Sequence, residues 1–231
     1  MSAIERRLLP DTAAVSADGA LSIGGVRIDD LVAEFGTPLF VYDEMHLRSR
    51  CRQAIAEFGE DGVVYATKAF LCGAMARLAH EEGLLLDVAT GGELFTAISA
   101  GVPAGRCVLH GNNKSSDELR LAITSGVNHI IVDSFDELDR LDALRAEGLP
   151  APHVQLRITP GVHAHTHEFV STGQDDSKFG FNLANGDAGR AIERAKSSAS
   201  VVLTGIHCHI GSNVLNAALF ARSEEHTSEL Q

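Results

Sequence analysis

The sequence predicts an α/β fold of the parallel (β/α) barrel type. Short runs rich in valine, isoleucine and leucine recur with little polar alternation, as is typical of strands buried on both faces of a parallel sheet. Amphipathic segments separate these runs, and the carboxyl ends of successive runs are about 21 to 25 residues apart over four units. No Gly-x-Gly-x-x-Gly follows the first run, so we favour a barrel over an open, dinucleotide-binding sheet.

Length and charge restrict the function classes. At 231 residues the chain suits one large domain or part of one. The net charge of -12 and a pI near 5.3 argue against a nucleic-acid or anionic-membrane partner, which would call for a basic face. The start lacks the apolar core of a signal peptide, and no apolar run is long enough to span a bilayer. The scattered cysteines fit reduced thiols in a cytoplasmic protein; they are Cys51, Cys72, Cys107 and Cys208.

The first 36 residues differ from the rest of the chain. Residues 21–28 alternate around Gly24-Gly25, which predicts a hairpin. Residues 29–35 then predict a short helix, closed by Gly36 and Pro38.

From Pro38 onward, buried strands and helices are expected to alternate. The expected strands are 39–42, 63–68, 84–90, 107–111, 129–134, 154–159 and 201–210. Two segments fit the capping box, in which a serine is followed three residues later by glutamate; they begin at Ser115 and Ser134. Three glycines follow helix ends, where a left-handed residue is favoured: Gly101, Gly126 and Gly148.

Lys68 ends the run that we take as the first barrel strand. The carboxyl end of a barrel strand is where catalytic side chains lie. A partly desolvated lysine there loses its proton more easily and can form a Schiff base. The plainer alternative is a strand-end lysine that extends its ammonium group to solvent.

The step from Thr159 to His209 is about twice the usual length for a βα repeat. Its surplus, residues 160–181, is polar and rich in titratable side chains: His163, His165, His167, Asp175, Asp176 and Lys178. An insertion at the carboxyl end of a barrel strand is where substrate-contacting residues are expected.

Two interpretations compete for the histidines. Alternating His207 and His209 point to one face of a strand and could share a metal with the insertion's histidines, but no His-Glu-x-x-His or clear acidic ligand supports this, and no metal is expected. In the second interpretation, His209 lies flat against a planar ring while Gly211 and Ser212 bind a phosphate. Together with Lys68, these groups suit pyridoxal 5'-phosphate (PLP).

Several short motifs, in order over about 220 residues, strengthen the second interpretation. They are Tyr65-Ala66-Thr67-Lys68-Ala69, Asp87-Val88-Ala89-Thr90-Gly91-Gly92-Glu93-Leu94, His110-Gly111-Asn112-Asn113-Lys114-Ser115, His165-Thr166-His167, Ser171-Thr172-Gly173, Ser177-Lys178-Phe179-Gly180 and His207-Cys208-His209-Ile210-Gly211-Ser212. With them the chain resembles the N-terminal part of the diaminopimelate decarboxylases, which belong to the PLP decarboxylases with an alanine-racemase-like barrel.

The resemblance implies roles for several residues. Lys68 would form the Schiff base with the cofactor, and His209 would stack on its pyridine ring. Gly211 and Ser212 would hold the phosphate. Three further residues would line the cofactor end: Asp87, Glu93 and Arg157. Without the resemblance, Asp87 and Glu93 are equally well a strand-end aspartate and a helix N-terminal glutamate, and Arg157 in an apolar strand should meet a carboxylate.

The reaction implied is removal of one α-carboxylate from meso-2,6-diaminopimelate to give L-lysine and CO2, by a homodimer with a small diamino acid as substrate. The alternatives are a non-catalytic PLP-binding barrel and a decarboxylase of another basic amino acid, such as ornithine or arginine. The family resemblance assigns residues 1–36 to a C-terminal β-domain and residues 37–221 to about six strands of a (β/α)8 TIM-type barrel. Because an unclosed barrel leaves strand edges unpaired, we expect this chain alone to aggregate and to be inactive.

The last ten residues, 222–231, depart from the pattern of the preceding helix. They match the translation of a widely used sequencing-adapter oligonucleotide. We therefore expect the natural sequence to end at or near Ala221, and we leave these ten residues out of the fold argument.

Overall fold

The computed structural model describes residues 5–161, 179–211, 218–228 and 230. It divides into two compact units. Unit 1 comprises residues 1–64 and 78–84, and unit 2 comprises residues 65–77 and 85–231. The predicted assignment of residues 1–36 to a separate β-domain stays a prediction.

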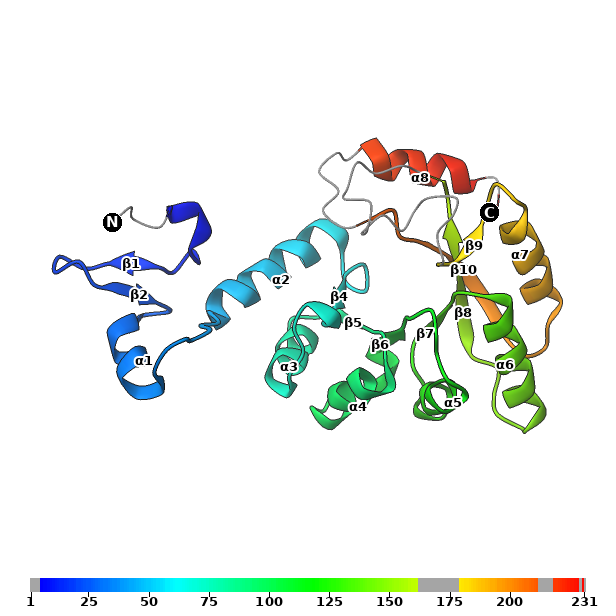
Figure 1. The fold of residues 1–231 in the computed structure, drawn as a ribbon, viewed down its shortest axis with the longest axis horizontal. Helices are drawn as coiled ribbons and strands as arrows, with labels where there is room; N and C mark the ends of the chain where they lie inside the picture. Colours follow the sequence, from blue (N-terminus) through cyan, green and yellow to red (C-terminus); the bar gives the residue numbers. More distant parts are fainter. Residues whose placement is uncertain (1–4, 162–178, 212–217, 229, 231) are drawn as a thin grey trace. The chain divides into compact units, whose positions relative to one another are not determined.

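Unit 1 begins with a small antiparallel sheet of order β1-β2-β3 (Figure 1). The predicted hairpin is confirmed: Ile23 pairs with Val26 across Gly24 and Gly25, which both have positive φ. The predicted helix after it is confirmed as well. The elements are η1 (Arg6–Leu8), β1 (Ala14–Val15), β2 (Leu21–Ile23), β3 (Val26–Arg27), α1 (Ile28–Phe35) and α2 (Glu44–Phe58).

The strand predicted at 39–42 is wrong, because this run is irregular. Phe40 is 87% exposed and Tyr42 is 54% exposed, so the apolar run is not a buried strand. Asp43 follows it as the N-cap of α2, accepting a hydrogen bond from the His46 amide. A short apolar run shows that burial is favourable, but only a neighbouring strand makes it part of a sheet.

Unit 2 is built on a parallel sheet of order β10-β8-β7-β6-β5-β4, with β9 paired to β8 off this path. The strands are β4 (Val64–Ala66), β5 (Leu85–Val88), β6 (Cys107–Leu109), β7 (His129–Val132), β8 (His153–Thr159), β9 (Phe181–Asn182) and β10 (Val202–Cys208). The six predicted barrel strands are therefore confirmed, in sequential order from β4 to β10. Their core includes Leu86, Leu109, Ile130 and Leu156, all fully buried.

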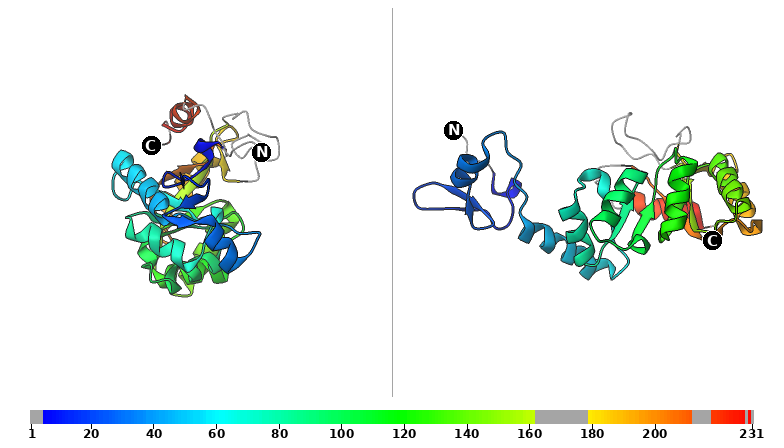
Figure 2. Two further views of the ribbon diagram at one scale, coloured as in Figure 1. Left: turned by 90° about the vertical axis from the view of Figure 1, so that its left-hand side faces the viewer. Right: turned by 90° about the horizontal axis from the view of Figure 1, so that it is seen from below.

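Helix α3 (Gly73–Glu81) is divided between the two units. The later helices of unit 2 lie along one side of the curved sheet, from α4 to α7 (Figures 1 and 2). They are α4 (Gly91–Ser99), α5 (Ser116–Ser125), α6 (Phe135–Ala146) and α7 (Asp187–Ser197). An open doubly wound sheet would carry such helices on both faces. The arrangement is that of a (β/α) barrel, as predicted. The last helix, α8 (Ala218–Ser228), runs across the boundary predicted at Ala221.

The predicted helix signals hold with one informative exception. Ser115 and Glu118 form a complete capping box, and Gly101, Gly126 and Gly148 all have positive φ. At Ser134 only half of the box forms. Its hydroxyl accepts from the Glu137 amide, but the Glu137 carboxylate binds Lys114 and the Asp133 amide instead.

No helix of the described residues is long and apolar enough to cross a membrane. Residues 162–178 of the predicted insertion lie outside the described residues.

Candidate active site

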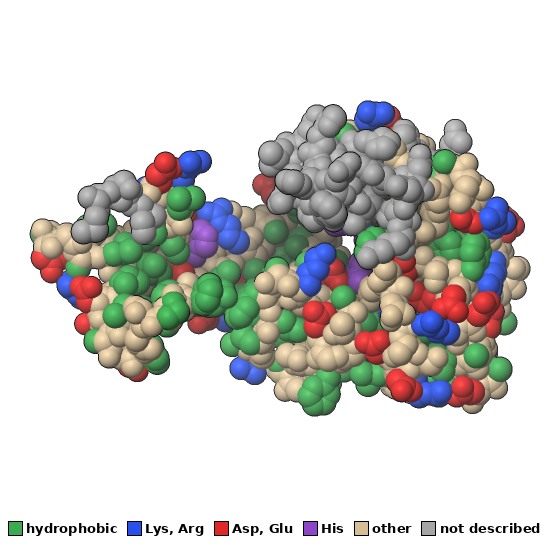
Figure 3. Space-filling model, viewed as in Figure 1, with side chains coloured by type: hydrophobic (Ala, Val, Ile, Leu, Met, Phe, Trp, Pro, Cys, Tyr) green, Lys and Arg blue, Asp and Glu red, His purple; other side chains and the backbone are tan. Residues whose placement is uncertain are grey.

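The candidate site lies in unit 2, where the carboxyl ends of the parallel strands meet. Lys68 lies in a short 3-10 turn, η2 (Thr67–Ala69), directly after β4. The Thr67 hydroxyl donates a 2.7 Å hydrogen bond to the Asp87 carbonyl, which fastens this turn to β5. Basic, acidic and histidine side chains meet on one face of unit 2 in the space-filling view (Figure 3).

Asp87 is the acidic side chain next to Lys68. Burial raises the pKa of Asp87 to about 6, the nearby Lys68 and Arg157 act against this rise, and Glu93 adds to it. The Asp87 carboxyl therefore exchanges its proton near neutral pH, beside the amine.

The raised pKa of Asp87 should show in stability. A raised native pKa favours folding below the ordinary value of 3.8, and this advantage is lost as pH rises through about 6. At pH 8 the cofactor-free protein then bears a cost of about 3 kcal/mol, so Asp87→Asn should stabilise it by up to that amount at pH 8 and not at pH 3.5. Urea unfolding at both pH values measures this, with Glu193→Gln on the exposed face of α7 as the matched control. A stabilisation of equal size at both pH values would contradict the argument.

Arg157 projects from β8 and is largely buried. Its Nη1 lies 3.6 Å from Oδ1 of Asp133, so the expectation that it meets a carboxylate is confirmed. The guanidinium also lies 4.7 Å from the centre of the Phe179 ring, a cation–π distance. Burial lowers the pKa of Arg157, while Asp133 and Asp87 raise it.

Two histidine rings meet edge to face beside these charges. The centres of the His110 and His207 rings are 5.0 Å apart, with planes at 78°. Burial lowers the pKa of His110 to about 3 and that of His207 to about 4, with neighbouring charges adding to both shifts. Both imidazoles are therefore neutral at pH 7. Nε2 of His110 lies 3.9 Å from Oδ1 of Asp87, which brings His110 into the site.

No role was predicted for His110, although it begins the motif His110-Gly111-Asn112-Asn113-Lys114-Ser115. Its position could have pointed to the site. His110 directly follows β6, and Lys68 stands two residues after the end of β4, so both lie at the carboxyl ends of strands.

Glu93 has a structural partner of its own. Its carboxylate accepts a 2.6 Å hydrogen bond from the Ala89 amide, while its own amide donates to the Thr90 hydroxyl at the start of α4. This geometry is that of the plainer alternative, a glutamate at a helix N-terminus. Glu93 still acts on the site through its charge, which raises the pKa of Asp87.

His209 and Gly211 follow β10, and Ser212 lies outside the described residues. Burial lowers the pKa of His209, and the positive charges of Arg157 and Lys68 lower it further. Gly211 has φ of +140°, which favours glycine. The predicted phosphate contacts of Gly211 and Ser212 stay predictions, as do the roles of residues in 162–178.

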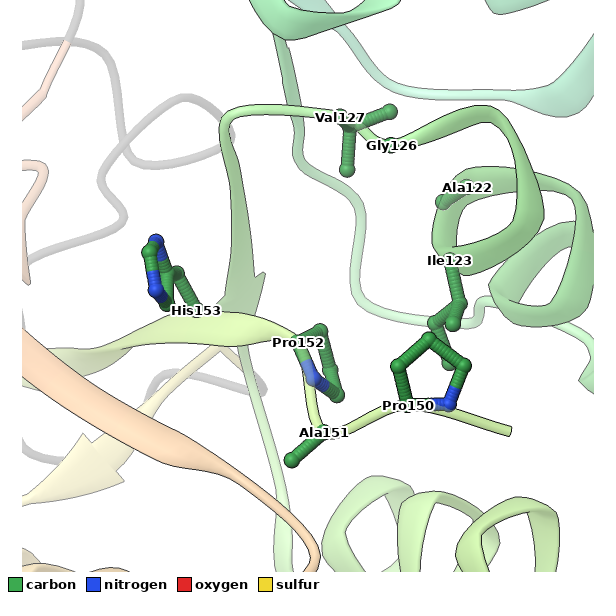
Figure 4. Close-up of a pocket in the computed structure, with 8 residues that line it drawn as sticks. All are labelled: Ala122, Ile123, Gly126, Val127, Pro150, Ala151, Pro152 and His153. Atoms are coloured by element: carbon green, nitrogen blue, oxygen red, sulfur yellow. The ribbon is translucent and has the colours of Figure 1, made fainter. Parts of the chain in front are cut away.

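A second hollow in unit 2 is unrelated to this site. A cavity of about 220 Å³ lies beside the start of β8, at the amino end of the sheet (Figure 4). Its lining is Ala122, Ile123, Gly126, Val127, Pro150, Ala151, Pro152 and His153. The lining holds no charged side chain, so it offers little for chemistry.

Comparison with known proteins gives the family. The sequence model described as "Pyridoxal-dependent decarboxylase, pyridoxal binding domain" matches residues 44–230. The chain therefore belongs to the pyridoxal-dependent decarboxylase family. This membership confirms the cofactor class predicted from the sequence.

Individual members of the pyridoxal-dependent decarboxylase family are similar over most of this chain. A diaminopimelate decarboxylase of Mycobacterium tuberculosis is 50% identical over 199 residues, covering 86% of this chain and 44% of that protein. One from Bacillus subtilis is 48% identical over 221 residues, covering 94% and 50%. The diaminopimelate decarboxylase of M. jannaschii in complex with L-lysine has a TM-score of 0.83 at 32% identity, covering 96% of this chain and 52% of that chain. The chain thus spans about half the length of these relatives.

The described residues fit a pyridoxal group in character. An amine stands at the carboxyl edge of the sheet beside the half-buried Asp87 carboxyl, and two imidazoles there are neutral at pH 7. Nδ1 of His207 is buried without a hydrogen-bond partner among the described residues. A polar atom buried in this way is suited to a bound group, since an unmet partner is otherwise costly.

Proposed function

We propose that this chain is the N-terminal part of a PLP-dependent diaminopimelate decarboxylase, which converts meso-2,6-diaminopimelate to L-lysine and CO2 in lysine biosynthesis. The observation that carries the proposal is the position of Lys68, whose amine stands at the strand ends beside Asp87, Arg157 and the histidines. The names of the relatives support the choice of substrate.

In this function PLP supplies the electron sink that makes loss of a carboxylate feasible. The protein's residues bind and orient. Lys68 would hold the cofactor through its amine, and His209 would contact it. Gly211 and Ser212 would bind its phosphate. Asp87 keeps a proton available beside Lys68, Glu93 fixes the neighbouring turn, and the Arg157 charge is fixed by Asp133.

The test uses the product of the source gene read to its stop codon, purified with PLP. Release of CO2 and formation of lysine are measured with meso-diaminopimelate, ornithine and arginine in parallel. Turnover of diaminopimelate at least about a hundredfold better than the other two, as for a site that hydrogen-bonds a group the others lack, supports the proposal. Preference for ornithine or arginine moves the function to another basic amino acid. PLP binding with no turnover of any of them leaves a cofactor-binding barrel.

The same proposal includes a cytoplasmic homodimer with a small diamino acid as substrate and neither nucleic acid nor membrane as partner. The acidic charge of -12 and the scattered cysteines favour this compartment and these partners. Light scattering of the purified protein gives the oligomeric state.

A further inference from the structure

The motif His110-Gly111-Asn112-Asn113-Lys114 has no role in the proposed function beyond the histidine. The second residue of this motif, Gly111, allows the backbone to make a close turn here. Gly111 has φ of +107°, and a Cβ placed there would lie 2.8 Å from the Ala89 carbonyl oxygen. Only glycine lets the chain turn this closely against the end of β5. The turn leads to Lys114, which is only 2% exposed.

The Lys114 ammonium group uses all three of its hydrogens at this place. Nζ donates to the Gly111 carbonyl at 2.5 Å and to the Ile131 carbonyl at 2.8 Å, and it binds the Glu137 carboxylate at 2.9 Å. One side chain therefore ties together the ends of β6 and β7 and the start of α6.

Glu137, which Lys114 holds in place, in turn holds the backbone of Asp133. Its Oε2 accepts the 3.1 Å hydrogen bond from the Asp133 amide, in place of the capping bond that the sequence predicted at Ser134. The Asp133 side chain then accepts from the Gly180 amide at 3.1 Å and faces Arg157 at 3.6 Å. Asp133 and Glu137 are 4% and 3% exposed, so little water competes for these contacts.

We propose that Lys114 and Glu137 are positioning residues that fix Asp133 and, through it, Arg157 against the cofactor. The inference rests on the proposed function. The four side chains form a buried row from the outer turn to the site, with two cations and two carboxylates. Arg157 at its inner end acts on Asp87, His207 and His209 through its charge.

Two double variants of the full-length gene product test this. Lys114→Met/Glu137→Leu replaces the buried ion pair by apolar groups, which is often neutral for stability, but it removes the acceptor of the Asp133 amide. Lys114→Met/Glu137→Gln loses the same charges and the same Lys114 hydrogen bonds, but it keeps an acceptor oxygen for the Asp133 amide. The matched control is Arg120→Met/Glu147→Leu, an exposed ion pair between α5 and the end of α6.

Affinity for PLP and the absorbance spectrum of the bound cofactor, followed from pH 6 to 9, are the measurements. We expect the Met/Leu variant to bind PLP about tenfold more weakly, the low end for loss of an outer partner of a binding group, with a shifted pH dependence of the spectrum. The Met/Gln variant should lie between it and the wild type, and the control should match the wild type. A general loss of stability could lower the affinity in this order, but it would not shift the pH dependence of the bound cofactor's spectrum.

A folded Met/Leu variant with wild-type affinity and an unchanged spectrum overturns the inference and leaves the row a purely structural feature. If that variant does not fold, the Met/Gln variant decides: wild-type affinity overturns the inference, and a two- to tenfold weakening supports it. Failure of the proposed function is distinct, because it shows in the unmodified protein, as absent PLP binding or as absent turnover of diaminopimelate, before any variant is compared.

Discussion

Lys68→Ala should lower decarboxylase activity at least about a thousandfold in the full-length gene product, because in the proposed function Lys68 supplies the amine that holds the cofactor covalently. Lys68 is the lysine at the strand ends beside Asp87, whose pKa its charge lowers. The fold should tolerate the change, since Lys68 is exposed and follows β4, which Thr67 already fastens to β5.

Borohydride reduction followed by peptide mass analysis locates the covalent link directly. The chain has four lysines: Lys68, Lys114, Lys178 and Lys196. We expect a cofactor-sized mass on the Lys68 peptide of the wild type and on no peptide of Lys68→Ala. Lys196→Ala, at an exposed position of α7, is the matched control and should retain both the label and the activity. Labelling of Lys114 instead would contradict the site described above.

The strand pattern was predictable because both faces of a parallel sheet are buried, so each strand is marked by its own residues. The run 39–42 has the same character and is not a strand. Such a run becomes a buried strand only if a neighbouring strand pairs with it, and the residues of the run do not show whether one does.

Some residues of the candidate site were likewise predictable from the sequence, and others were not. Lys68 and Arg157 were identifiable because a charge next to or within an apolar run needs a use or a partner. The partner of Arg157 is Asp133, which lies 24 residues earlier in sequence but on the adjacent strand end, a pairing that only the register of β7 and β8 determines. His110 was missed for the same reason, since its contact with His207 joins strands that are not neighbours in the sheet.

Lys114 was the least predictable of these residues. It stands in a polar turn, where a lysine is normally solvated, and its partner Glu137 fits a capping box equally well on sequence grounds. The fold brings the two together within 2.9 Å in the interior. A local signal at Ser134 was thus overridden by a buried charge that would otherwise have no counter-ion.

Lys114→Met alone should destabilise the protein by about 3 to 5 kcal/mol at pH 8, because it leaves the Glu137 carboxylate buried without its counter-ion. The side chains of Lys114 and Glu137 are 1% and 4% exposed, so water cannot replace the lost partner. Burial already raises the pKa of Glu137, and Lys114 lowers it. Removing Lys114 therefore raises that pKa further.

The raised pKa of Glu137 determines how the stability of Lys114→Met changes with pH. A carboxyl whose native pKa is raised favours folding fully below its ordinary value of 4.5, and the advantage is lost as pH rises through the native pKa. The loss of stability in Lys114→Met should accordingly be largest at pH 8 and shrink as pH falls toward 4.5. Urea unfolding of variant and wild type at pH 8 and pH 5 measures the difference. Lys114→Met/Glu137→Gln, which lacks the titrating group, should lose this pH dependence, and Lys196→Met should cost nothing at either pH. A destabilisation that stays the same from pH 8 to pH 5 would mean that Glu137 is not the group left without a partner.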